Sequence, residues 1–147
     1  AGNTTLANLK AVTDRGFINR KKENEVARDY IRQLKTKAPG EGTSCMTLSG
    51  GNQQKVVLAK WLYTQADILI LDEPTRGIDV GAKYEIYQLI HKFVGEGKSV
   101  IMISSEMPEV LGMADTILVM KEGRVSKIFA DATGVTQEQI LEAAMNM

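Results

Sequence analysis

The stretch "ILILDEP", residues Ile68 to Pro74, is a continuous apolar run that ends in two adjacent carboxylates. Such runs are typical of strands buried on both faces, which occur in parallel sheets covered by helices. A helical pattern at Val80 to Val94 follows, and then a second apolar strand at Ser99 to Ser104. This order of strand, helix and strand predicts an α/β layer with a mostly parallel sheet.

Helical and turn patterns flank these strands. Gly51 to Thr64 has an apolar stripe that predicts a helix with Trp61 in the core. Two apolar runs around Gly123 predict a β-hairpin near the C-terminal end. Thr136 and Gln139 have the spacing of a capping box and predict a last helix.

The first forty residues have a different pattern. Thr5 to Val12 and Lys21 to Lys35 show helical spacing of apolar residues, and Lys37 to Thr43 is a Pro- and Gly-containing loop. We therefore expect a small helical lobe before the α/β layer.

Composition excludes several classes of protein. Lys+Arg and Asp+Glu are 18 each, so the net charge is +0 and no overall basic field favours nucleic acid. The single cysteine, Cys45, allows no internal disulfide. No apolar run approaches the ~20 residues of a membrane span.

Asp72 and Glu73 come at the carboxyl end of the first predicted strand. Open α/β sheets bind ligands at this edge, and Mg²⁺ on a nucleotide needs only one or two carboxylates besides water. Asp72 is therefore a candidate magnesium ligand and Glu73 a candidate base for an attacking water. The alternative is a strand that ends in a solvated acidic turn.

Ser49, Gly50 and Gly51 begin the predicted helix that follows the loop. Ser49 can cap the helix, and bare glycines allow backbone amides to approach a phosphate at the positive end of the helix dipole. The alternative is an ordinary glycine-rich helix start.

Taken together, "LSGGNQQK" (48–55) and "ILILDEPTRGID" (68–79) resemble the ATP-binding cassette family at its signature, Walker B and D-loop segments. The resemblance extends from Asn8 to Phe129 and is closest to the second, C-terminal cassette of fused bacterial monosaccharide import ATPases of the ribose or galactose/methyl galactoside type.

The resemblance implies an α/β fold, with a partial P-loop NTPase-type layer, a C-terminal β-hairpin and a helical lobe at the N-terminal end. Residues 1–47 would be the helical lobe, 48–130 the signature, Walker B and D-loop part of the core, and 131–147 a C-terminal helical tail.

The resemblance also implies roles for individual residues. Asp72 would hold Mg²⁺ through water, and Glu73 would be the catalytic base. The residues expected to contact ATP held by an opposing cassette, or to bridge the two cassettes, are Ser49, Gly50, Gly51, Asn52, Gln53 and Asp79.

One position departs from the family pattern. Where most cassettes have a His that senses the γ-phosphate, this chain has Ser105. A neutral hydroxyl does not supply the imidazole contact to developing charge. We therefore expect an impaired site at Asp72 and Glu73, while the intact signature serves the other site.

The chain contains no G-x-x-x-x-G-K-[ST] phosphate loop. The nearest stretch, "GEGKSV" (95–100), follows a helix and opens a strand, which is the reverse of the required context. We expect the loop to precede the helical lobe in a longer protein, so the isolated chain should be inactive. Incomplete sheets should also expose apolar surface and favour self-association.

The resulting functional prediction is part of the energy-coupling ATPase of a sugar importer, peripheral on the cytoplasmic face of the bacterial inner membrane. ATP and Mg²⁺ would act in the full assembly. Expected partners are the companion N-terminal cassette, permease transmembrane subunits and, indirectly, a sugar-binding protein, with no nucleic acid. Two alternatives are a soluble cassette ATPase of DNA maintenance or translation and a non-catalytic interaction fragment.

Overall fold

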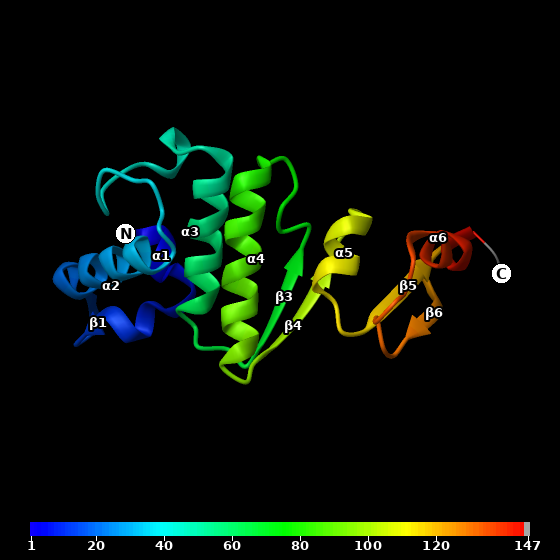
Figure 1. The fold of residues 1–147 in the computed structure, drawn as a ribbon. Coiled ribbons are helices and arrows are strands. Elements are labelled where there is room, and N and C mark those ends of the chain that lie inside the picture. Colours follow the sequence, from blue (N-terminus) through cyan, green and yellow to red (C-terminus); the bar gives the residue numbers. More distant parts are fainter. Residues whose placement is uncertain (146–147) are drawn as a thin grey trace. The chain divides into compact units, whose positions relative to one another are not determined.

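The computed structural model describes residues 1–145, in which helices alternate with short strands (Figure 1). The elements are α1 (Gly2–Thr5), η1 (Leu6–Val12, a 3₁₀-helix), β1 (Thr13–Asp14), β2 (Phe17–Ile18), α2 (Arg20–Gln33), η2 (Cys45–Thr47), α3 (Gly50–Leu62), β3 (Ile68–Asp72), α4 (Val80–Gly95), β4 (Ser99–Ile103), α5 (Met107–Met113), β5 (Ile117–Lys121), β6 (Arg124–Phe129) and α6 (Gln137–Met145). They form two compact units, one from Ala1 to Met102 and one that starts at Ile103. None of the helices within residues 1–145 is long and apolar enough to cross a bilayer.

The helical lobe of the first unit differs from its prediction in one segment. α2 agrees with the predicted helix, and the side chain of Asn19 caps it by accepting from the amides of Lys21 and Lys22. The helix predicted at Thr5 to Val12 is wrong as a single α-helix, because Asn8 leaves helical geometry at φ −143° and ψ 55°. The chain forms 3₁₀ turns there and then the small antiparallel hairpin β1–β2, which the sequence did not reveal.

Strands β3 and β4 form a two-stranded sheet linked through α4. Their arrows point the same way in Figure 1, and the amide of Ser99 at the start of β4 bonds to the Asp67 carbonyl just before β3. This is the predicted parallel strand–helix–strand unit. The prediction that β3 is buried on both faces is wrong, since Leu69 and Leu71 are buried whereas Ile70 on the other face is 66% exposed.

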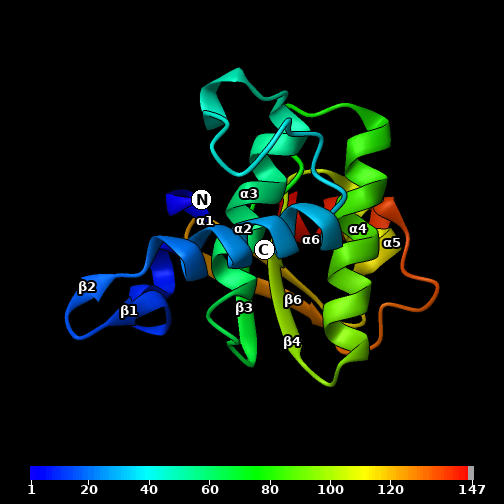
Figure 2. The same cartoon turned by 90° about the vertical axis from the view of Figure 1, so that its left-hand side faces the viewer.

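Helices α3 and α4 lie side by side and supply half of the buried apolar residues of this unit (Figure 2). Leu58 and Ala59 of α3 and Ile86, Ile90 and Phe93 of α4 are buried. Trp61 was predicted as core, but its side chain is 45% exposed, and the ammonium of Lys60 lies 4.7 Å from its ring centroid. The predicted apolar stripe is therefore rotated toward Leu58 and Ala59.

The second unit packs α6 on one face of the antiparallel hairpin β5–β6. Its core contains Ile117 and Val119 of β5 with Ile140 and Ala143 of α6. The predicted capping box is confirmed: the Thr136 amide donates to Gln139 Oε1 at 3.0 Å, and the Gln139 amide donates to Thr136 Oγ1 at 3.4 Å. These bonds satisfy amides that the start of a helix otherwise leaves unpaired.

Candidate functional site

The N-terminal end of α3 is the centre of the candidate site. Ser49 occupies the N-cap position with φ −63° and ψ 156°, and both Ser49 and Gly50 are exposed. The Ser49 hydroxyl does not cap the helix, which differs from the expectation. Instead it accepts a hydrogen bond of 2.8 Å from Asn52 Nδ2. The first amides of α3 are therefore not capped by that side chain, and the hydroxyl is held beside them.

The side chains of Asn52 and Gln53 form hydrogen bonds within the chain. Asn52 Oδ1 accepts from the Lys37 amide at 2.7 Å, and Gln53 Nε2 donates to the Leu48 carbonyl at 2.9 Å. Asn52 thus joins the loop that follows α2 to the start of α3. Both side chains orient the segment around Ser49, a contribution that spacing alone did not indicate.

The two glycines of the segment have different surroundings. A Cβ placed on Gly50 would meet Ile78 Cγ2 at 3.5 Å and the Gly77 carbonyl at 3.8 Å, which are ordinary contacts. A Cβ on Gly51 would lie 2.5 Å from the Cβ of Ala82, closer than real Cβ atoms approach. Gly51 is therefore required by helix packing, whereas Gly50 is exposed and could accept a Cβ without a clash.

The segment after β3 turns sharply toward α4. Asp72 is exposed at the carboxyl end of β3, and Glu73 is half-buried with φ +46°, a left-handed conformation that residues other than Gly adopt rarely. The Arg76 amide bonds back to the Glu73 carbonyl at 3.2 Å, while Pro74 and Thr75 are fully buried. Asp72 and Glu73 thus stand at the start of a hydrogen-bonded turn whose next two residues are buried.

Asp79 ends this turn and begins α4. Its Oδ1 accepts from the Ala82 amide at 2.9 Å, so the carboxylate caps the helix. The sequence signal was present, because Asp before a helical pattern is a preferred N-cap. With Gly50 against Gly77 and Ile78, the structure brings the start of α3 and the turn before α4 together.

Ser105 lies in the second unit, between β4 and α5. The neighbouring Ser104 hydroxyl donates to Glu109 Oε2 at 2.6 Å and accepts from the Glu106 amide at 3.1 Å. These bonds hold the segment that carries Ser105.

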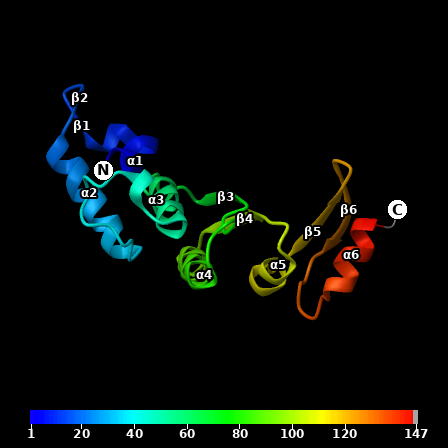
Figure 3. The same ribbon diagram turned by 90° about the horizontal axis from the view of Figure 1, so that it is seen from above.

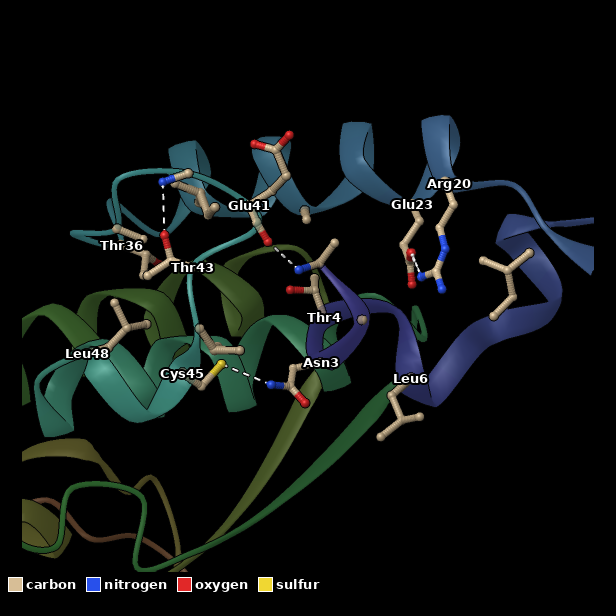
Figure 4. A pocket seen from close by; sticks show the side chains of 18 of the residues that line it. Asn3, Thr4, Leu6, Arg20, Glu23, Thr36, Glu41, Thr43, Cys45 and Leu48 are labelled. Carbon is tan, nitrogen blue, oxygen red and sulfur yellow. Dashed lines mark hydrogen bonds and ion pairs between the residues drawn. The ribbon is translucent and has the colours of Figure 1, made fainter.

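Three other features bear on what the chain could bind. A cavity of about 460 Å³ lies between α1, η1, α2 and the loop before α3, and none of the predicted nucleotide residues lines it (Figure 4).

The "GEGKSV" stretch is confirmed as a helix end, because Gly97 has φ +82° and Lys98 Nζ bonds to the Ala66 carbonyl at 3.1 Å. Within residues 1–145 no three His, Cys, Asp or Glu side chains group as metal ligands. A magnesium ion bound mainly by phosphate and water needs no such group, and the exposed carboxylate of Asp72 fits that kind of site.

Comparison with known proteins gives consistent results. Residues 2–76 match the family described as ABC transporter. The chain is 50% identical over 143 residues to a ribose import ATP-binding protein, RbsA, of Rhodopirellula baltica. It is 51% identical over 142 residues to a xylose import ATP-binding protein, XylG, of Geobacillus kaustophilus. It is 49% identical over 143 residues to a galactose/methyl galactoside import ATP-binding protein, MglA, of Clostridium tetani. Each alignment covers 97% of this chain but 28% of the relative.

Solved structures show the same fold. An inward-facing metal-chelate type ABC transporter has a TM-score of 0.79 at 16% identity, over 97% of this chain and 55% of that one. A dimeric post-hydrolysis state of the ATP-binding cassette MJ0796, bound to ADP and Pi, has a TM-score of 0.73 at 21% identity, over 92% of this chain and 58% of that one. These similarities confirm the predicted α/β, P-loop NTPase-type fold class.

Proposed function

The chain belongs to the ABC transporter family, and from this premise we propose that it is part of the ATP-hydrolysing, energy-coupling subunit of a bacterial monosaccharide importer. Relatives named for import of ribose, xylose and galactose match it equally well, at 49–51% identity. This equality supports sugar import as a class. It also fits a motor that does not select the sugar.

The exposed start of α3 is the observation that carries the proposal. Ser49 and Gly50 are accessible, and the first amides of the helix are oriented at the positive end of its dipole. Because the Ser49 hydroxyl accepts from Asn52, its own hydrogen remains available to donate to another acceptor. A terminal phosphate oxygen of ATP, held by the companion cassette, is an acceptor of the right charge.

The turn before α4 would complete this contact between cassettes. Gly77 and Ile78 lie close to Gly50, so a displacement of the turn would be transmitted to the signature end. Asp79 uses one oxygen to cap α4, and its other oxygen would form the bond across the interface. We therefore assign Ser49 to Gln53 to the trans contact with the partner's nucleotide, and Asp79 to the bridge between the two cassettes.

Asp72 and Glu73 form the second part of the proposal. Asp72 would hold Mg²⁺ through water, and Glu73 would orient the attacking water as a base. With Ser105 in place of the usual His, turnover at this site would be weak. The assembly would then hydrolyse ATP mainly at the site that borrows Ser49 to Gly51.

The proposed surroundings follow from this role. The chain would act on the cytoplasmic face of the inner membrane with its companion cassette and permease subunits, and indirectly with a sugar-binding protein. Residues 1–47 would be the helical lobe, 48–130 the core part and 131–147 the C-terminal tail. Alone, without a phosphate loop, the chain should not turn over ATP.

The test compares two variants of the longer protein in its assembled importer. Gly50→Ala should abolish most ATP turnover, whereas Glu73→Gln should leave most of it. If Glu73→Gln is as damaging and Gly50→Ala is not, the roles of the two sites are reversed. Magnesium-dependent ATP hydrolysis by the pure 147-residue chain would refute its predicted inactivity.

A further inference from the structure

The hairpin β1–β2 and the preceding η1 lie at one end of α2 (Figures 2 and 3), and they carry exposed apolar side chains. Phe17 is 82% exposed, Leu6 is 58% exposed and Ile18 is 40% exposed. Leu6 and Ile18 also line the cavity of about 460 Å³, whereas Phe17, which directly follows the turn of the hairpin, does not. We call Leu6, Phe17 and Ile18 the hairpin tip.

Cationic residues are frequent in the segment that forms this hairpin and the start of α2. Between Lys10 and Glu23 the sequence has five Lys or Arg residues and two carboxylates, although the whole chain has a net charge of +0. Both carboxylates are occupied: Asp14 pairs with Lys22 at 2.6 Å, and Glu23 pairs with Arg20 at 2.7 Å. No ion pair within residues 1–145 neutralises the three remaining cations, Lys10, Arg15 and Lys21.

The position of the cations at α2 is unfavourable for the helix itself. Arg20, Lys21 and Lys22 occupy the first turn, where the positive end of the helix dipole disfavours cations. Lys22 is compensated by Asp14 and Arg20 by Glu23, but Lys21 has no such partner in the described residues. Local rules broken in this way are expected where a segment has a binding role.

We propose that the hairpin tip and its cations bind the surface of an anionic lipid bilayer. Phe17 would enter the interface between headgroups and acyl chains, and Lys10, Arg15 and Lys21 would contact lipid phosphates. Exposed aromatic and aliphatic side chains beside Lys and Arg form the combination that interfacial binding requires. A bilayer accepts a projecting tip of this kind, whereas a folded protein partner would need a matching hollow.

Sedimentation of the 147-residue chain with lipid vesicles tests this surface. The chain should bind vesicles containing phosphatidylglycerol more tightly than pure phosphatidylcholine vesicles, and salt should weaken the binding. Phe17→Ser should reduce the partition coefficient about tenfold, from the transfer of one large apolar side chain. Lys10→Gln and Lys21→Gln should each reduce it roughly fivefold, as one cation near an anionic surface does.

A matched control lies on the other hairpin. Val125→Ser combined with Arg124→Gln removes an exposed apolar side chain and an exposed cation from β6 and should leave binding unchanged. Equal losses in this control, or equal binding to neutral vesicles, would overturn the proposal. Binding that salt abolishes and that Phe17→Ser does not alter would also overturn it, since charge alone, as on an acidic protein surface, would then be responsible. Circular dichroism checks that each variant remains folded.

Discussion

Substituting Gly51 by Ala tests the packing of the two central helices. The added Cβ would lie 2.5 Å from the Ala82 Cβ, against 3.4 Å for the start of ordinary van der Waals contact. The obstructing atom belongs to a short side chain fixed to the backbone of α4, so it cannot rotate away. α3 and α4 must therefore separate by most of 1 Å at their N-terminal ends.

The expected cost can be worked out from two opposing effects. Overpacking of a well-packed contact destabilises proteins by about 1–3 kcal/mol. Ala is preferred to Gly in a helix by up to about 1 kcal/mol, which offsets part of this cost. Gly51→Ala should thus lower the free energy of unfolding of the first unit by about 1–2 kcal/mol. Gly50→Ala, whose Cβ meets only ordinary contacts at 3.5 and 3.8 Å, should leave it unchanged or slightly raised.

Urea denaturation of the two variants measures these differences, and a compensating substitution supplies the control. Ala82→Gly removes the obstructing methyl group, so Gly51→Ala combined with Ala82→Gly should be more stable than the sum of the two single changes predicts. If Gly51→Ala unfolds at the wild-type urea concentration, or if Ala82→Gly gives no rescue, the close contact is not present. Comparing Gly50→Ala with Gly51→Ala also separates a role in activity from a role in packing. Gly50→Ala should remove ATP turnover in the longer protein without loss of stability.

Three further predictions concern stability. The side chain of Lys55 is 3% exposed, pairs with Glu85 at 2.8 Å and donates to the Lys35 carbonyl at 3.2 Å. Lys55→Met should therefore lower the free energy of unfolding, measured by urea denaturation, by about 1–3 kcal/mol. The control Lys21→Met changes an exposed side chain and should leave this free energy nearly unchanged. The hydrogen bond from the Arg20 guanidinium lowers the pKa of Glu23 below its ordinary 4.5. This carboxylate therefore stabilises the fold above pH 4.5, and the stabilisation is lost as the pH falls through the lowered pKa. Glu23→Gln should abolish that part of the pH dependence of the urea midpoint. Thr136→Ala removes one bond of the capping box and should lower the stability of the second unit by about 1 kcal/mol in thermal denaturation, and an unchanged melting temperature would contradict the cap.

The order of strands and helices could be predicted from the sequence because its signals are local. The apolar run at Ile68 to Leu71, the helical spacing at Val80 to Val94 and the capping pair Thr136 and Gln139 all act within a few residues of chain. The same is true of the motifs that indicated an ATP-binding cassette, since they are contiguous. The roles of their residues in nucleotide binding remain predictions.

Burial and contact between segments could not be predicted in this way. Trp61 and Ile70 are apolar and have suitable spacing, yet they face outward because burial depends on which other segment packs against them. Likewise, nothing near Gly51 in the sequence shows that Ala82 lies against it. The sequence by itself determined the family motifs and most of the secondary structure after the first twenty residues, through interactions over one or two turns; it missed the 3₁₀ turns of η1 and the β1–β2 hairpin. Only the tertiary structure decided which helix faces are covered and which glycine is required for packing, because those outcomes depend on residues distant along the chain.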